Sequence, residues 1–306
     1  MTLQPGAERI LIVGEALVEF VRSERGPDLD APGTFRGPYP SGAPAIAADA
    51  AALAGADVVF VSTVGPDAFG ASVLDRLTRD GVGVARIRRV AGATTGTAFV
   101  AYEDTGDRSF VFHVADAAPG HITGDDLGEE PERATWIHVS GATLALSGTM
   151  ASVTLEAIDR ILAHGGRLSL VPNLRPEATR AEEALGEIRS LCARASLLFP
   201  DLSEAGTLAV ELEAAARSGA TVCVTRGSGG VGVQHDGVVD DIVGIPVDEV
   251  DPTGAGDTFA GVFLARFAMG ADPHEAAVAA NAAAAAHVAA PGPMERIGWP
   301  SGARLP

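Results

Sequence analysis

The most informative stretch of this sequence is Asp251-Pro252-Thr253-Gly254-Ala255-Gly256-Asp257-Thr258-Phe259. Small residues at 254–256 allow the backbone to approach a ligand closely. The apolar residues that follow have helical spacing, which places the Gly-Ala-Gly turn at the N-terminus of a helix that runs to about Met269. Free amide groups and the helix dipole at such a terminus favour an anion, for example a phosphoryl group in transfer.

A carboxylate at this point is unusual, because it would repel the anion that the amide groups attract. Asp257 makes chemical sense there if it accepts the proton of a hydroxyl nucleophile while Gly254, Ala255 and Gly256 hold the phosphoryl group. The helix dipole is expected to keep this carboxylate ionised at neutral pH. The alternative is that Asp257 only caps the helix after a glycine-rich turn.

Outward from this stretch, short β-rich runs alternate with helical runs along the whole chain. Such alternation predicts an α/β fold with a mainly parallel central sheet and helices on both faces. Strands are expected at 10–13, 58–61, 97–102, 109–114, 136–139, 168–171, 197–199, 222–225, 231–234 and 238–243. Helices are expected at 45–53, from a cap at Asp67 to Gly81, and at 147–163, 181–194, 256–269 and 273–289.

One region departs from this alternation of strands and helices. Residues from about 84 to 118 are β-rich, with a hairpin expected around Asp104-Thr105-Gly106-Asp107, and they contain no helical pattern. Together with parts of residues 15–40 they are expected to form a small lid that projects from the main sheet. Since no linker or repeat divides the sequence, residues 1–306 are predicted to form a single domain.

Polar side chains follow two of the expected strands. Ligands bind beyond the carboxyl ends of parallel strands, so these side chains are candidates for a common site. After the strand at 168–171, Arg175 could offer two parallel hydrogen bonds to a phosphate or carboxylate. After the strand at 197–199, Asp201 and Glu204 could hold Mg²⁺ through water, or could simply begin a helix as its cap and first-turn glutamate.

A second glycine-rich run is Thr225-Arg226-Gly227-Ser228-Gly229-Gly230-Val231-Gly232. It formally contains the G-x-G-x-x-G pattern of dinucleotide-binding proteins, which requires a helix at its last glycine. The residues at 231–234 are β-like instead, which disfavours a Rossmann dehydrogenase. The run is therefore interpreted as a loop that approaches a nucleotide phosphate or ribose, or as an ordinary turn between strands.

Composition narrows the range of partners. The chain has 306 residues, of which 47% are hydrophobic, and a formal net charge of −18. An acidic chain without a basic cluster is a poor binder of nucleic acid or of an anionic membrane. Its two cysteines, Cys192 and Cys223, supply neither a disulfide framework nor a set of metal ligands. With no secretory segment visible in residues 1–9, a cytoplasmic location is expected.

Taken together, these motifs resemble the ribokinase-like, or PfkB-type, family of ATP-dependent sugar kinases. The stretch at 251–259 is similar to the C-terminal signature of that family. The resemblance covers nearly the whole chain through Gly14-Glu15, Ser41-Gly42-Ala43-Pro44-Ala45, Val64-Gly65-x-Asp67-x-x-Gly70, Ser140-Gly141-x-Thr143-Leu144-Ala145, Asn173-x-Arg175, Asp201-x-x-Glu204, Thr225-x-Gly227-x-x-Gly230 and an alanine-rich helix with Asn281.

The resemblance implies a role for each matching position. Asp257 is similar to the catalytic base of the family, and Gly254, Ala255 and Gly256 to its anion hole. Asp201 and Glu204 stand where the family has Asn-x-x-Glu, which organises Mg²⁺ and phosphates. Asp251, with the carbonyl groups near 286–292, resembles the K⁺ site of many members. Nucleotide-binding positions are matched by Asn173, Arg175, Thr225, Arg226, Gly227, Gly230 and Asn281.

On the sugar side, the motifs look most like those of 2-keto-3-deoxygluconate kinases and fructokinases. Ile46 replaces an asparagine that touches the sugar, and His113 stands near an arginine that binds the carboxylate of a keto acid. Val171 replaces an aspartate, and Val262 occupies a position that is usually small. The substrate-binding positions are then Gly42, Ala43, Ile46, His113, Arg175 and Asp257. The β-rich lid resembles the family lid, which covers the sugar and often forms a homodimer contact.

The expected function is transfer of the γ-phosphoryl group of ATP, with Mg²⁺, to a hydroxyl of a hexose, a ketose or a sugar acid such as 2-keto-3-deoxygluconate. Two alternatives stay open. A nucleoside or another small alcohol could be the acceptor, because Ile46 permits an altered pocket. A non-catalytic regulator that binds sugar or nucleotide is the other, although such a protein has no need of Asp257 in an anion hole.

Overall fold

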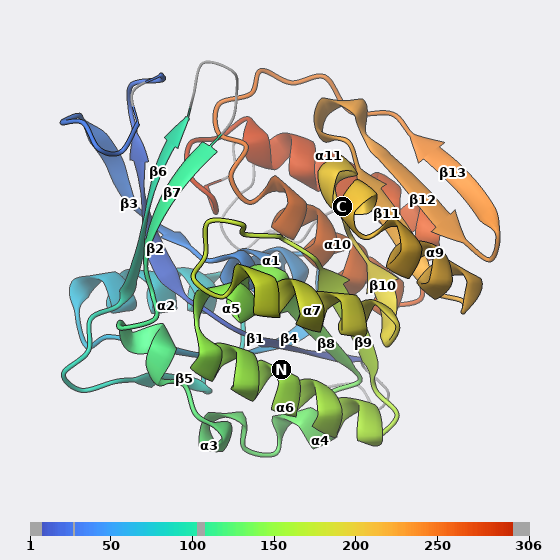
Figure 1. Ribbon diagram of the computed structural model, residues 1–306, viewed down its shortest axis with the longest axis horizontal. Coiled ribbons are helices and arrows are strands. Elements are labelled where there is room, and N and C mark those ends of the chain that lie inside the picture. Colours follow the sequence, from blue (N-terminus) through green and yellow to red (C-terminus); the bar gives the residue numbers. More distant parts are fainter. Residues whose placement is uncertain (1–7, 27, 103–107, 296–306) are drawn as a thin grey trace.

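The apolar runs of the sequence form the strands of a large sheet (Figure 1). The computed structural model describes residues 8–26, 28–102 and 108–295, and within them this sheet has nine strands in the order β13-β12-β11-β10-β9-β8-β1-β4-β5. The strands from β11 to β5 are parallel, and β12 is antiparallel to both of its neighbours. They comprise β1 (Arg9–Val13), β4 (Asp57–Val64), β5 (Ile87–Arg89), β8 (Trp136–Ser140), β9 (Arg167–Val171), β10 (Ala195–Leu198), β11 (Thr221–Thr225), β12 (Val231–His235) and β13 (Val238–Ile242).

Helices cover both faces of the large sheet, which confirms the predicted fold class (Figure 1). One face packs against α1 (Ala43–Leu53), α2 (Ala68–Arg79), α10 (Ala255–Ala268) and α11 (Pro273–Val288). The other packs against α5 (Gly141–Leu146), α6 (Gly148–Ala163), α7 (Ala181–Cys192) and α9 (Ala209–Arg217). Phe60 and Phe263 are fully buried on the first face and Ile137 and Ile158 on the second. Burying such a side chain stabilises the fold by about 1.5–3 kcal/mol.

Short helical segments complete the chain. They are η1 (Ala118–His121), α3 (Gly124–Leu127), α4 (Glu130–Arg133), α8 (Leu202–Thr207) and η2 (Gly227–Gly229). Among the helices of the described residues, none combines the length and the apolar character that crossing a bilayer would require.

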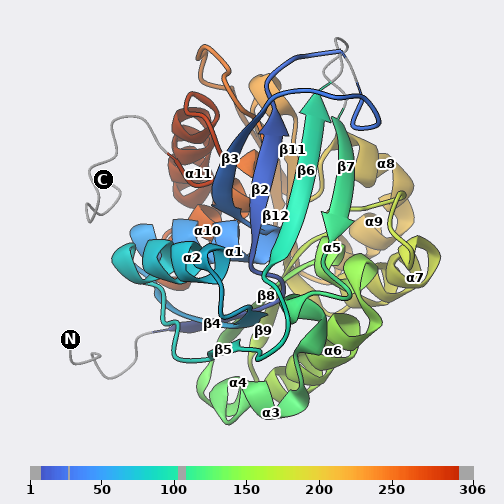
Figure 2. The same ribbon diagram turned by 90° about the vertical axis from the view of Figure 1, so that its left-hand side faces the viewer.

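A second sheet stands at one end of the large sheet and faces the reader in Figure 2. Within the described residues it has four strands in the order β3-β2-β6-β7. Its strands are β2 (Leu17–Arg22), β3 (Phe35–Ser41), β6 (Gly96–Tyr102) and β7 (Arg108–His113). β6 and β7 pair antiparallel, which confirms the predicted hairpin, although the expected turn at 104–107 lies outside the described residues.

The structure corrects the bounds predicted for the lid. β5, at 87–89, lies within the predicted range 84–118 but pairs with β4 in the large sheet, and η1 closes the end of that range. A strand of three residues is too short to show alternation, so its sequence could not reveal which sheet it joins. The helices α5 and α9 were also not predicted, and the organisation as one domain stays a prediction.

The carboxyl ends of the parallel strands meet at one edge of the large sheet, beneath the small sheet. β8 ends at Ser140, β9 at Val171, β10 at Leu198 and β11 at Thr225. The polar stretches singled out in the sequence follow β9, β10 and β11 directly. The turn before α10 differs, since it follows an irregular stretch at 243–254 rather than a parallel strand.

The cap of α2 provides a test of this packing. Asp67 accepts hydrogen bonds from the amide of Gly70 (2.8 Å) and from the amide and hydroxyl of Thr95 (both 2.7 Å). We expect Asp67→Ala to lower the free energy of unfolding by about 2 kcal/mol, measured by urea denaturation, because a cap and two tertiary bonds are lost. Asp272→Ala is the control, since Asp272 caps α11 through one exposed bond to Glu275 (2.8 Å). Asp272→Ala should lower the free energy of unfolding by about 1 kcal/mol or less. Equal decreases in the two variants would show that the link between Asp67 and Thr95 contributes nothing.

Candidate active site

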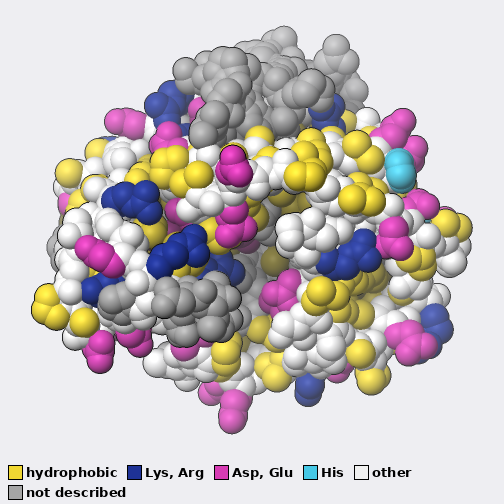
Figure 3. Space-filling model, turned by 90° about the horizontal axis from the view of Figure 1, so that it is seen from above, with side chains coloured by type: hydrophobic (Ala, Val, Ile, Leu, Met, Phe, Trp, Pro, Cys, Tyr) yellow, Lys and Arg dark blue, Asp and Glu magenta, His cyan; other side chains and the backbone are white. Residues whose placement is uncertain are grey.

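A cavity of about 850 Å³ lies between the inner face of the small sheet and the carboxyl edge of the large sheet. On the side seen in Figure 3 the surface is hollowed near its middle, with acidic and basic side chains at the rim. The predicted residues that line the cavity come from stretches far apart in the sequence. They are Ala43, Ile46, Val171, Asn173, Arg175, Asp201, Glu204, Thr225, Gly227, Gly254, Ala255, Gly256 and Asp257.

The Gly-Ala-Gly turn begins α10 as predicted. Gly254 is the N-cap residue with a φ of 84°, in the left-handed region that favours glycine. A Cβ atom at this position would lie 2.8 Å from Cδ1 of Ile46, so a larger residue would strain the backbone and displace the Ile46 side chain. No side chain of the described residues caps α10. The amide of Ala255 donates to the carbonyl of Pro252 (3.2 Å). The next amide groups, those of Gly256 and Asp257, are therefore left for a ligand, and the electrostatics of a helix N-terminus favour an anion.

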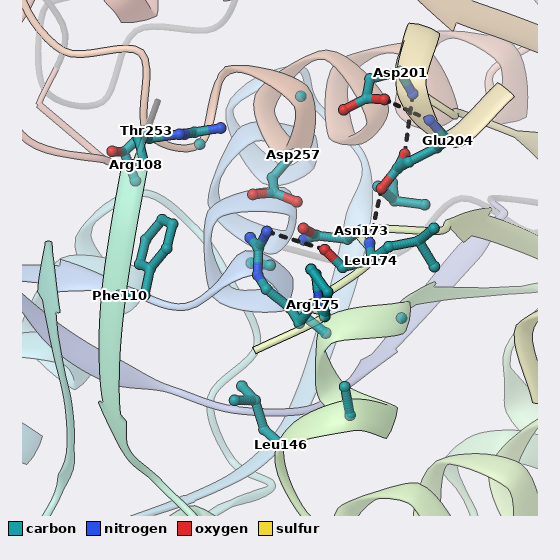
Figure 4. A pocket seen from close by; sticks show the side chains of 18 of the residues that line it. Arg108, Phe110, Leu146, Asn173, Leu174, Arg175, Asp201, Glu204, Thr253 and Asp257 are labelled. Atoms are coloured by element: carbon teal, nitrogen blue, oxygen red, sulfur yellow. Dashed lines mark hydrogen bonds between the residues drawn. The ribbon is translucent and has the colours of Figure 1, made fainter. Parts of the chain in front are cut away.

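Asp257 is the third residue of α10, within the helix rather than at its cap. The alternative interpretation, that this residue only caps the helix, is therefore wrong. Its carboxylate faces Arg175 across the middle of the cavity, with Phe110 on one side and the Asp201–Glu204 pair on the other (Figure 4). This position leaves the carboxylate next to any anion that the turn holds.

The environment of Asp257 tunes its proton affinity. Burial raises the pKa of Asp257 to about 7, the guanidinium groups of Arg175 and Arg108 act against this rise, and the carboxyl groups of Glu15 and Glu204 add to it. The helix dipole therefore keeps only part of this carboxylate ionised at neutral pH, less than expected, because desolvation outweighs the dipole. A carboxylate with a pKa near 7 is well matched to accept a proton at neutral pH.

The loop after β9 places two more predicted residues. Asn173 has a φ of 42° and donates a hydrogen bond from Nδ2 to Oγ of Ser140 (3.0 Å), which fixes the loop to the end of β8. Arg175 packs on the small sheet, with its Cζ 5.2 Å from the ring centre of Phe110 in β7. Arg175 is thus held between the two sheets, and its guanidinium group is available to an anion in the cavity.

Asp201 and Glu204 form a reciprocal capping box at the start of α8. The amide of Glu204 donates to Asp201 Oδ1 (2.8 Å), and the amide of Asp201 donates to Glu204 Oε2 (3.0 Å). Glu204 Oε1 also accepts from the amide of Leu174 (2.8 Å), and burial raises the pKa of Glu204. Both residues line the cavity, so the two interpretations of this pair are compatible: it begins a helix and it faces the site.

Two buried carboxyl groups at the other end of the cavity were missed as site residues. Glu15 accepts a hydrogen bond from Oγ1 of Thr143 (2.7 Å), and Glu19 in β2 accepts one from Oγ of Ser41 (3.1 Å). Burial raises the pKa of Glu15 to about 7 and that of Glu19 to about 8. Leu17 and Glu19 alternate along β2 and line the cavity together with Glu15, which lies just before the strand.

His113 does not line the cavity. Alternation along β7 directs Arg108, Phe110 and Phe112 inward, and His113 lies exposed on the opposite face, where its ring centre is 6.2 Å from that of Phe99. The prediction of His113 as a substrate residue is therefore wrong. A shift of one residue in a strand moves a side chain to the other face, and the sequence alone did not define the register.

The remaining predicted residues do not line the cavity. Gly42 and Gly230 have structural reasons to be glycine, since a Cβ would approach a carbonyl oxygen to 2.5 Å at Gly42 and to 2.0 Å at Gly230. Arg226 forms an ion pair with Asp241 (2.8 Å), and Asn281 donates from Nδ2 to the carbonyl of Val243 (2.9 Å). Their contacts with a nucleotide stay a prediction. Asp251 is buried beside the turn.

The fold and this cavity are those of a ribokinase-like sugar kinase. A model of the family described as "pfkB family carbohydrate kinase" matches residues 7–299, and the chain belongs to that family. It is therefore a phosphotransferase with an alcohol group as acceptor, which confirms the family and the class of enzyme predicted from the sequence.

Relatives and solved structures agree with this assignment. The chain is 32% identical over 277 residues to the fructokinase of Vibrio alginolyticus, with 86% of this chain and 85% of the relative covered. A structure described as Ribokinase II from E. coli, in complex with ATP and Mg²⁺, superposes with a TM-score of 0.86 at 34% identity, over 97% of this chain and 96% of that one. A double mutant of fructokinase from Vibrio cholerae, with fructose, ADP and potassium bound, has a TM-score of 0.81 at 26% identity, with 96% of each chain covered.

The raised pKa of Glu19 predicts a pH-dependent stability. The folded protein binds this proton more tightly than the unfolded chain, whose pKa is 4.5, so stability falls as the pH rises from about 4.5 towards 8. We expect Glu19→Gln to raise Tm by at least about 2 °C at pH 8.5 and to change it little at pH 5, as measured by scanning fluorimetry. Exposed Glu249 provides the control, and Glu249→Gln should leave Tm unchanged at both pH values. An equal shift from Glu19→Gln at both pH values would contradict the prediction.

Proposed function

We propose that this kinase phosphorylates fructose, or a closely related neutral sugar, with ATP as the phosphoryl donor. The observation that carries the proposal is the position of Asp257, whose pKa is about 7, between an anion-binding turn and the pocket at Glu15 and Glu19. Fructokinases among the relatives support a ketose as the acceptor.

In this proposal the acceptor hydroxyl lies between Asp257 and the γ-phosphoryl group. Asp257 accepts the hydroxyl proton as the oxygen attacks phosphorus, and the bond between phosphorus and the oxygen of the departing ADP breaks. The amide groups at the start of α10 stabilise the phosphoryl oxygens. Arg175 adds a positive charge beside them, which an acidic protein must supply locally.

The nucleotide is proposed to lie across the loop after β11. Thr225 and Gly227 line the cavity there, and Asn281 and Arg226 hold the neighbouring strand and loop through Val243 and Asp241. The other side of that region is formed by α11. These contacts support a base and ribose position next to α11 with the phosphates directed to the turn at Gly254.

The residues at the cavity rim fit the magnesium ion that accompanies ATP. Asp201 is exposed and Glu204 is close beside it, and carboxylate oxygens are ligands that Mg²⁺ accepts directly or through water. Among the described residues no group of three or more His, Cys, Asp or Glu side chains could hold a metal alone, so phosphate oxygens and water would complete the shell. When bound, the ion neutralises phosphate charge.

At the acceptor end, the lining favours a neutral polyhydroxy compound. Buried Glu15 and Glu19 can accept hydrogen bonds from hydroxyl groups, and Phe110 and Phe112 offer an apolar wall to the carbon face of a sugar. Glu15 and Glu19 keep part of their negative charge near neutral pH, and this charge would repel the carboxylate of a sugar acid. Arg108 and Arg175 also line the cavity and would offset part of that repulsion.

Two further expectations, the oligomeric state and the cellular location, also stay proposals. Rings of Phe20 and Phe99 stack at 5.2 Å on the outer face of the small sheet, next to Phe35 and to Val111, which is 43% exposed. This apolar character supports a homodimer formed through the lid. A cytoplasmic location rests on the sequence alone.

A panel of acceptors tests the proposed substrate. We expect the kcat/KM for fructose, from a coupled assay of ADP release, to exceed that for 2-keto-3-deoxygluconate by at least about 10-fold, because the acid meets Glu15 and Glu19. Ribose, glucose and adenosine complete the panel. Turnover confined to adenosine would reject a sugar kinase at this site, and a preference for the keto acid would reject the role given to the two carboxyl groups.

The role of Asp257 has its own test. Asp257→Asn keeps the size of the side chain but cannot accept the proton, so we expect kcat to fall by at least about 10²-fold. Calorimetry should show ATP binding close to that of the parent. In the parent, kcat/KM should rise with pH through an apparent pKa near 7, and this dependence should disappear in the variant.

The remote cap Asp272 provides a matched control for this measurement, because it is exposed at the start of α11. Asp272→Asn should retain the turnover and the pH profile of the parent. Near-normal turnover of Asp257→Asn would show that Asp257 is not the base. Loss of the folded circular dichroism spectrum in this variant would show that Asp257 is needed for folding instead.

A further inference from the structure

One buried histidine holds both ends of the catalytic turn. His287, in the last turn of α11, is fully buried. Its Nε2 lies 2.6 Å from the carbonyl oxygen of Thr253, and its Nδ1 lies 3.0 Å from Oγ1 of Thr258. A carbonyl oxygen only accepts, so Nε2 carries a hydrogen, and Nδ1 is left to share a hydrogen bond with the hydroxyl of Thr258. The four residues between these anchors are those predicted for the anion hole and the base.

The turn is also enclosed on its other side. A Cβ built on Gly254 would lie 3.3 Å from His287 Nε2 and 2.8 Å from Ile46 Cδ1, so the turn is packed between the imidazole ring and α1. Its position is therefore set by two elements that lie far apart in the sequence. A displacement of about 1 Å at a phosphoryl site can cost about 10²-fold in rate.

The same region was predicted to hold a monovalent cation at Asp251 and the carbonyl groups near 286–292. Asp251 is buried, and its Oδ1 accepts from the hydroxyl of Tyr102 (2.5 Å) and from the amide of Thr253 (3.1 Å). Its Oδ2 accepts from the amide of Gly292 (3.0 Å). Both carboxylate oxygens therefore already face protein donors.

Two of the neighbouring carbonyl groups are engaged as well. Val288 O accepts from the amides of Val250 (2.8 Å) and Asp251 (3.1 Å), and Gly292 O accepts from the amide of Glu295 (3.3 Å). Thr253 O accepts from His287, as described above. Within the described part of this region, these oxygens point at N–H and O–H groups, so a cation would have only the lone pairs that these donors leave. The N–H of His287 and the O–H of Tyr102 thus already bring partial positive charge to oxygens at which the ion was predicted.

We propose that His287 is a positioning residue for phosphoryl transfer, and that the N–H of His287 and the O–H of Tyr102 replace a monovalent cation beside the turn. Their positive ends face the Thr253 carbonyl and the Asp251 carboxylate, where they offset negative charge close to the transferring phosphoryl group. Turnover by this enzyme then requires no potassium. This inference about His287 and Tyr102 rests on the proposed function in one respect only, the use of fructose as the acceptor in the assay.

Substitution of His287 separates a positioning role from a structural one. His287→Leu removes both hydrogen bonds, and we expect kcat to fall by at least about 10-fold while the KM for ATP changes by less than about 3-fold. His287→Gln returns an amide donor near the position of Nε2 and should recover most of the lost kcat. Equal losses in both variants, or an unchanged kcat in His287→Leu, would overturn the positioning role.

A matched control is His138, a second fully buried histidine, whose Nδ1 lies 2.9 Å from Oγ of Ser169 within the large sheet. His138→Leu should lower Tm and leave the kcat of the folded enzyme within about 2-fold of the parent. If His287→Leu does not fold, Thr258→Val removes one bond of the clamp and Thr258→Ser retains it. A lower kcat in Thr258→Val than in Thr258→Ser supports the proposal, and equal values overturn it.

The ion is tested on the unmodified enzyme. We expect kcat in potassium chloride and in tetramethylammonium chloride to agree within about 2-fold, and Tm to agree within about 1 °C, because the two donors already supply positive charge beside the turn. Activation by potassium of about 10-fold, or a potassium-specific rise in Tm of several degrees, would overturn the replacement of the cation. Absence of turnover with fructose in the parent would instead show that the proposed acceptor is wrong, while the Tm comparison stays valid.

Discussion

The close packing around Gly254 is the constraint on which the site depends. Its backbone is left-handed, and a side chain here would have to displace Ile46 on one side and press against His287 on the other. This packing directs the first amide groups of α10 and the carboxylate of Asp257 into the cavity. It also gives a structural role to Ile46, which stands where the resemblance implies an asparagine that touches the sugar. A buried apolar side chain at this position supports the turn as well as lining the cavity.

Much of this arrangement could be predicted from local sequence, because its causes are local. Apolar runs and helix caps such as Asp67 predicted the order of strands and helices, and a glycine-rich turn before a helix predicted the anion site at Asp257. The misses have a physical pattern. To place His113 and Glu19 correctly, one has to know which face of a strand points inward. To place β5, one has to know how distant segments pair. Such long-range register leaves little trace in a single sequence.

Electrostatics at the site could not be derived from composition. The net charge of −18 suggests a cavity that repels nucleotides. Burial raises the pKa of Glu15, Glu19 and Asp257 to between about 7 and 8, so near neutral pH part of this negative charge is absent. A helix terminus carries only about half an elementary charge, whereas full burial can shift a pKa by about 3–5 units. Desolvation therefore determines how the cavity receives an anion.

The small sheet joins the end of the cavity proposed for the acceptor to the end proposed for the phosphoryl group. β2 carries Glu19 at the first of these ends, while β6 places Tyr102 against Asp251 and Thr253, next to the turn. β7 places Phe110 against Arg175. A kinase must keep water away from the phosphoryl group, or hydrolysis competes with transfer. Because the sheet that covers the acceptor also contacts the turn and the arginine, exclusion of water and alignment of the phosphoryl site depend on the same strands.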